Sequence, residues 1–125
     1  DKSIPRAVER LLMPGSMRSL DSGHRDYRGV YAGDEDTCRK QAYHNGTGWG
    51  GVYPLYAEAM VECGLSSRDT ALDLLAAAVE NINRGCLCHI SENADGDSPH
   101  LQKGCTAQGW SDSEFLRVWL KLGGM

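Results

Sequence analysis

Apolar residues recur at helical spacing in several stretches of the chain, and helix-ending or helix-capping residues bound each of them. Pro14 and Gly15 close the first stretch, and Gly64 closes the second because glycine readily takes the left-handed conformation that ends a helix. The third begins after Ser66 and Ser67, whose hydroxyls can cap it. The pattern predicts helices over residues 6–13, 49–63, 67–84 and 107–122.

The alternation typical of strands is almost absent, so the sequence predicts an all-α fold. A tight turn separates helices 49–63 and 67–84, which favours an antiparallel helix pair. We expect residues 1–125 to form a single helical unit. Residues 16–41 and 85–105 are long connections, and loops of that length in a compact domain are usually functional or disordered.

Composition excludes several classes of protein. The 125 residues include 13 Lys and Arg against 17 Asp and Glu, and the formal net charge of −4 without a basic cluster argues against a nucleic-acid partner. No apolar run approaches the ~20 residues that span a bilayer, so we predict no membrane partner. The sequence starts without a secretory signal pattern, and its five cysteines favour reduced thiols in a cytoplasmic protein.

Two short motifs have some features of metal-binding sites, one for zinc and one for calcium. Cys86, Cys88 and His89 could hold zinc, but finger-like sites place two to four residues between their cysteines. Asn93, Asp95 and Asp97 alternate like the early ligands of a calcium loop, yet the glycine and the later glutamate of such a loop are misplaced. We therefore predict no metal and no cofactor.

The first group of candidate functional residues precedes helix 49–63. The run Tyr43-His44-Asn45-Gly46-Thr47-Gly48-Trp49 combines aromatic rings with hydroxyl, amide and imidazole groups, which suit the faces and hydroxyls of a sugar. A purely structural interpretation has Thr47 capping the helix and Trp49 filling the core. That interpretation explains Thr47 and Trp49 better than it explains the Tyr-His-Asn run.

The second group lies between residues 90 and 97. Glu92 follows an apolar stretch and precedes a turn, so its carboxylate is a candidate for the partial burial that acid–base catalysis uses. Asp95-Gly96-Asp97 is explained more simply as a solvent-exposed turn.

Taken together, these segments resemble one known family. Ala42-Tyr43-His44-Asn45-Gly46-Thr47 resembles the Ala-Tyr-His-Asn/Gln-Gly-Thr signature of the glycogen debranching enzyme family, in its C-terminal amylo-α-1,6-glucosidase domain. The segments Ile90-Ser91-Glu92, Asp95-Gly96 and 103–111 resemble the last block of the same domain, and residues 27–33 resemble its lead-in. The segments occur in the family's order across nearly the whole chain.

The resemblance implies the C-terminal part of an (α/α)6 toroid that hydrolyses α-1,6-linked glucose at the branch points of glycogen or a related α-glucan, with inversion. One carboxylic acid protonates the leaving oxygen in that chemistry, and an opposed carboxylate activates water. By position, Glu92 matches the general base. The residues that match the sugar-binding wall are Tyr43, His44, Asn45, Thr47 and Trp49, with Gln108 and Trp110 supporting it from the last helix.

This chain also departs from the family pattern. The family usually has Trp-Pro after the Gly-Thr pair, whereas this chain has Trp49-Gly50-Gly51. Gly109 stands where alanine is common. The segment Cys38-Arg39-Lys40-Gln41 lacks the usual Arg-Asp pair before the signature. The Thr-Trp-Met-Asp segment that carries the family's general acid does not occur in these 125 residues. We therefore expect a C-terminal piece of a larger enzyme, inactive alone, that joins the remainder of the toroid or self-associates through exposed apolar helix faces. The alternatives are a non-catalytic helical module that binds carbohydrate or protein, and a related glycosidase for another sugar.

Overall fold

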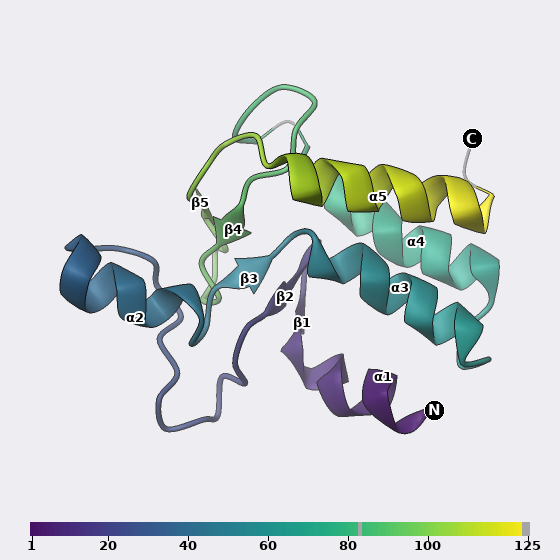
Figure 1. Cartoon of the computed structure of the whole chain (residues 1–125), viewed down its shortest axis with the longest axis horizontal. Helices are drawn as coiled ribbons and strands as arrows, with labels where there is room; N and C mark the ends of the chain where they lie inside the picture. Colours follow the sequence, from purple (N-terminus) through teal and green to yellow (C-terminus); the bar gives the residue numbers. More distant parts are fainter. Residues whose placement is uncertain (83, 124–125) are drawn as a thin grey trace.

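A computed structural model describes residues 1–82 and 84–123, and for Asp36 it describes the backbone only. The three longest helices lie side by side, with a small sheet at one end of them (Figure 1). These helices are α3 (Val52–Glu62), α4 (Arg68–Val79) and α5 (Gly109–Leu122). The chain reverses between α3 and α4, so these two helices run antiparallel.

The shorter helices lie outside this layer. Helix α1 (Ser3–Val8) continues into a 3₁₀ turn over Glu9–Leu11 and packs near α3. A π-helical turn over Glu35–Arg39 leads directly into α2 (Lys40–Tyr43), which projects from the other side of the sheet in Figure 1. Helix α2 therefore places the Tyr43 end of the candidate sugar-binding run at the edge of the sheet.

The sheet joins segments that are far apart in the sequence. Its five strands are antiparallel and follow one another in sequence order. Gly48 pairs with Ala94 and Trp49 pairs with Asn93, so the two candidate functional segments lie side by side. The strands are β1 (Leu12–Met13), β2 (Ser16–Arg18), β3 (Gly48–Trp49), β4 (Asn93–Ala94) and β5 (Gln102–Lys103).

This sheet shows that the predicted all-α fold class, and with it the assignment to an (α/α)6 toroid, is wrong for this structure. The chain instead combines five α-helices with an antiparallel five-stranded sheet in the described residues. Each strand has only two or three residues. Such short segments cannot display the alternation over four to eight residues by which a strand is recognised in a sequence.

The helix boundaries follow local signals where these exist. Ser67 caps α4 as predicted, because its Oγ accepts a hydrogen bond from the Thr70 N–H at 3.1 Å. Gly64 has φ +64° just after α3, as expected of a helix-ending glycine. Other boundaries differ from the prediction: α3 starts at Val52 instead of 49, and α4 ends at Val79 instead of 84. The helix predicted over 6–13 instead covers Ser3–Val8, because Leu12–Met13 forms β1. Helix α3 starts late because Trp49 belongs to β3.

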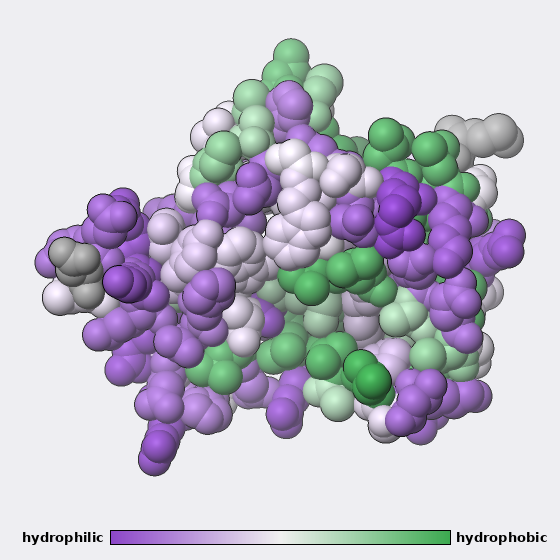
Figure 2. Space-filling view, viewed as in Figure 1, coloured by the Kyte–Doolittle hydropathy of each residue, from purple (hydrophilic) through white to green (hydrophobic). Residues whose placement is uncertain are grey.

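The hydrophobic core lies between the three long helices. Leu75 and Val118 are fully buried, and small residues at Ala57, Ala71 and Ala78 allow the helix backbones to approach closely. Figure 2 shows apolar surface near the middle of one face, between α1 and α3, whereas polar side chains cover α2 and the loop before it. None of the helices in the described part of the chain is long and apolar enough to cross a membrane.

Candidate active site around Glu92

Glu92 lies directly before β4, and the pairing of β3 with β4 brings it next to the end of α2. The Tyr43 hydroxyl donates a hydrogen bond to Glu92 Oε1. The other carboxylate oxygen, Oε2, accepts the Cys105 N–H at 2.9 Å. The Glu92 N–H in turn donates to the Cys105 carbonyl at 2.8 Å, so side chain and backbone are both fixed.

Gly104 is part of this arrangement because it leaves room for the carboxylate. Its φ is +69°, a conformation that residues with a side chain rarely adopt. A Cβ on Gly104 would lie 2.5 Å from Glu92 Oε2 and 2.9 Å from Asn93 Oδ1. The position of the Glu92 carboxylate therefore depends on a glycine at 104.

The hydrogen bond to Glu92 also determines the state of Tyr43. Because the phenol donates to a carboxylate, its ionisation would place two negative charges together, and this raises the pKa of Tyr43 to about 12. Partial burial raises the pKa of Tyr43 further, as a smaller effect. Tyr43 is therefore a neutral donor at physiological pH. An ionised carboxylate offers about four lone-pair positions, so Glu92 keeps acceptor capacity for a water molecule beside its two protein donors.

Glu92 lines a hollow that is open to solvent. The hollow has a volume of about 300 Å³ and carries both charges and hydroxyl groups on its walls. The wall residues are Tyr31, Glu35, Arg39, Lys40, Tyr43 and Glu92. This combination suits an uncharged, hydroxyl-rich ligand, because charged and hydroxyl side chains can hydrogen-bond sugar hydroxyls from several directions.

Four aromatic rings connect this hollow to an apolar groove. Tyr43 contacts both His44 and Trp49 edge-on, with centroids 4.7 Å apart in each pair. His44 and Trp49 stack with an interplanar angle of 6°. The ring centroids of Trp49 and Trp110 are 6.4 Å apart. His44, Trp49 and Trp110 also line the apolar groove, together with Met17 and Val52. The predicted residues Tyr43, His44, Trp49 and Trp110 are thus brought together in space.

The remaining predicted site residues contact mainly the chain itself. Thr47 is fully buried, and its hydroxyl donates to the Tyr43 carbonyl at 2.8 Å instead of capping α3. The exposed Asn45 amide donates to the Gln41 carbonyl at 2.8 Å. Gln108 precedes α5, and its N–H donates to the Ile90 carbonyl at 2.9 Å. These three residues shape the segments on either side of the hollow.

Asp112 was not a predicted site residue, but its carboxylate holds the segment His89–Ile90 just before Glu92. Its Oδ1 accepts the Ile90 N–H at 2.8 Å, and its Oδ2 lies 2.7 Å from His89 Nδ1. The candidate zinc ligand His89 is thus engaged by a carboxylate in the first turn of α5. Among residues 1–82 and 84–123, no group of three or more His, Cys, Asp or Glu side chains is placed to hold a metal ion.

The expectation of a solvent-exposed turn at 95–97 is wrong for Asp95. Asp95 is only 5% exposed, Gly96 is buried, and only Asp97 faces solvent. Asp95 Oδ1 accepts the Tyr31 N–H at 2.7 Å. The composition Asp-Gly-Asp is typical of turns, so no local signal distinguished the buried aspartate from the exposed one.

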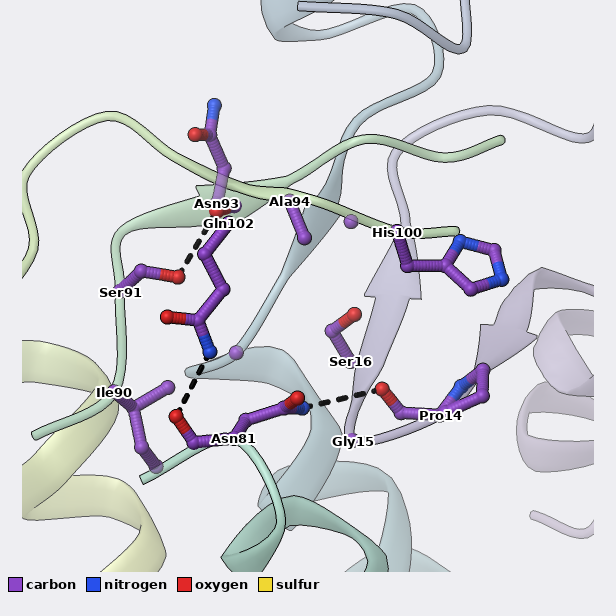
Figure 3. A pocket seen from close by; sticks show the side chains of 12 residues that line it. Pro14, Gly15, Ser16, Asn81, Ile90, Ser91, Asn93, Ala94, His100 and Gln102 are labelled. Atoms are coloured by element: carbon purple, nitrogen blue, oxygen red, sulfur yellow. Dashed lines mark hydrogen bonds between the residues drawn. The ribbon is translucent and has the colours of Figure 1, made fainter. Parts of the chain in front are cut away.

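A second, more enclosed pocket is lined by residues of β2, β3, β4 and β5. Figure 3 shows its walls bonded to one another: Gln102 Nε2 donates to the Asn81 carbonyl at 2.8 Å, and Asn81 Nδ2 donates to the Pro14 carbonyl at 3.3 Å. The pocket has room for about one water molecule. It is too small for a sugar ring, so the open hollow at Glu92 is the better candidate for a substrate site.

One of three comparisons with known proteins found a match, to a family model. The model of a glycosidase family, described as amylo-alpha-1,6-glucosidase, matches residues 1–117, which is nearly the whole chain. The chain therefore belongs to the amylo-alpha-1,6-glucosidase family, and the resemblance noted in its sequence is confirmed. Comparisons with curated proteins and with solved structures found no match.

Proposed function

We propose that this chain supplies the general base of an enzyme that hydrolyses α-1,6-linked glucose at branch points of glycogen or a related α-glucan. The observation that carries this proposal is the setting of Glu92. Its carboxylate receives hydrogen bonds from the Tyr43 hydroxyl and the Cys105 N–H, and it borders an open hollow. Membership of the amylo-alpha-1,6-glucosidase family supports the reaction class.

In the proposed reaction, Glu92 accepts a proton from a water molecule whose oxygen attacks the anomeric carbon. The bond between that carbon and the bridging oxygen breaks, and a second carboxylic acid protonates the departing oxygen. Attack from the opposite face inverts the configuration, which requires the two carboxyl groups to lie ~6.5–9.5 Å apart. Tyr43 keeps Glu92 oriented and, because its pKa is raised to about 12, stays protonated throughout.

We further propose that the acid comes from a polypeptide segment with the family's Thr-Trp-Met-Asp motif, which these 125 residues lack. Contact with such a segment would also cover the apolar side chains that α5 exposes. Leu116 and Leu120 are 58% and 61% exposed, one helical turn apart.

The test is hydrolysis of a maltooligosaccharide that carries one α-1,6-linked glucose, with and without the polypeptide that bears the missing motif. We expect glucose release only from the combination, with the β-anomer appearing first in the NMR spectrum. Glu92→Gln should lower the rate by at least ~10²-fold, since general base catalysis typically contributes 10²–10⁴. Glu80→Gln makes the same chemical change at an exposed site just after α4 and should have no effect.

Each part of the proposal has its own contrary result. Hydrolysis by the isolated chain would contradict the division of acid and base between two segments. Full activity in Glu92→Gln would contradict the assigned base, and initial release of the α-anomer would contradict inversion. A combination that binds the oligosaccharide unchanged would favour a non-catalytic carbohydrate-binding function instead.

A further inference from the structure

Tyr31 lies in the wall of the Glu92 hollow, although the sequence analysis assigned it no role. Its ring centroid is 5.7 Å from that of Tyr43, and the Arg39 guanidinium lies 5.8 Å from the Tyr31 centroid. These two neighbours limit the positions that the Tyr31 ring can take.

The Tyr31 hydroxyl has no hydrogen-bond partner among the described residues, whereas three other tyrosine hydroxyls do, including that of Tyr53, which donates to the Leu74 carbonyl. Tyr43 donates to Glu92 and Tyr27 donates to Asp97. A phenol can donate one hydrogen bond and accept others, so an unengaged phenol in an open hollow is suited to a ligand hydroxyl. The hollow already contains the Glu92 carboxylate, so such a ligand would contact both groups.

Asp95 determines where Tyr31 lies. The segment around Tyr31 belongs to no helix or strand, and the polar contacts of residues 95–97 hold it in place. Asp95 Oδ1 accepts the Tyr31 N–H at 2.7 Å, and the Gly96 N–H donates to the Gly29 carbonyl at 2.7 Å. A buried carboxylate is costly unless it is paired. The second oxygen of Asp95, Oδ2, lies 3.6 Å from Lys103 Nζ. Asp95 therefore links the position of Tyr31 to β4 and, through it, to Glu92.

We propose that Tyr31 is a further substrate-binding residue that hydrogen-bonds a sugar hydroxyl in the Glu92 hollow, and that Asp95 is its positioning residue. The proposal rests on the proposed function, because it takes the substrate to be an α-1,6-linked glucoside. It adds a specificity contact beside Tyr43, the first residue of the predicted aromatic run. It also gives the buried Asp95 carboxylate a role in the site.

The test is titration of the isotopically labelled 125-residue chain with isomaltose, followed by NMR. Tyr31→Phe should weaken binding roughly 3- to 10-fold, the loss expected for one net hydrogen bond. Tyr27→Phe is the matched control, because it removes a hydroxyl from the same segment that is already bonded to Asp97. We expect it to bind isomaltose like the unaltered chain.

Asp95 is tested by comparing two substitutions at the same position. Asp95→Ala should weaken binding about as much as Tyr31→Phe, and the double variant should show little further loss, because both act through one contact. Asp95→Asn should restore binding, since its amide oxygen still accepts the Tyr31 N–H. Thermal unfolding of each variant separates this effect from a general loss of stability.

The outcomes separate this proposal from the proposed function. Unchanged binding by Tyr31→Phe, while Glu92→Gln abolishes hydrolysis in the combined enzyme, overturns the role of Tyr31 alone. Additive losses in the double variant, or no rescue by Asp95→Asn, overturn the positioning role of Asp95. If the unaltered chain does not bind isomaltose and the combined enzyme is inactive, both proposals fail.

Discussion

Replacing Gly104 by alanine tests whether the activity depends on the exact position of the Glu92 carboxylate. The new Cβ would lie 2.5 Å from Glu92 Oε2, and ordinary contact begins at about 3.4 Å, so the carboxylate oxygen must move by about 0.9 Å. The Glu92 Cβ at 3.0 Å limits how the side chain can move away. A misplacement of ~1 Å in a catalytic group can cost ~10²-fold in rate.

Gly64→Ala provides a matched control. Gly64 has φ +64°, close to the +69° of Gly104, but nothing lies within 4 Å of its added Cβ. Both substitutions should therefore lower the free energy of unfolding by the similar cost of ~1–2 kcal/mol for a left-handed residue with a side chain. Only Gly104→Ala carries the additional displacement of Glu92.

The assays are urea unfolding for stability and hydrolysis of the branched oligosaccharide by the combined enzyme for activity. We expect the two variants to differ modestly in stability and by about two orders of magnitude in rate. Equal activities for Gly104→Ala and Gly64→Ala would refute the reasoning. Such a result would mean that the carboxylate position imposed by this glycine does not matter for the reaction.

Two further predictions test the phenol–carboxylate pair and the core. Glu92→Ala should lower the pKa of Tyr43 from about 12 toward 10, whereas the pKa of Tyr53, raised to about 12 mainly by burial, should stay where it is. Absorbance titration of the phenolates measures both, and an unchanged titration would contradict the hydrogen bond. Because the pKa of Tyr43 is raised in the folded chain, its contribution to stability is complete below pH 10 and should be lost as the pH rises through 12. Leu75→Ala, at a fully buried position, should cost ~2–5 kcal/mol in urea unfolding, and Leu116→Ala, at a position 58% exposed, under ~1 kcal/mol. An equal loss of unfolding free energy for the two leucine substitutions would contradict the assignment of Leu75 to the core.

The sequence was informative wherever a structural signal is local. Ser67 caps the helix that follows it, and Gly64 ends the helix that precedes it, because capping and left-handed turns involve residues only a few positions apart. The candidate base could be singled out in the same way. Glu92 stands at the edge of an apolar stretch, and the contiguous motif around it carries the resemblance to the family.

The tertiary structure alone decided the sheet and the surroundings of the candidate base. The pairing of Gly48 with Ala94 joins residues 46 positions apart, and two-residue strands leave no periodicity to detect. The same long-range pairing sets Tyr43 against Glu92 and lets the buried Asp95 accept a hydrogen bond from the Tyr31 N–H. Local sequence chemistry specified which groups were available, whereas non-local backbone hydrogen bonds determined which of them meet.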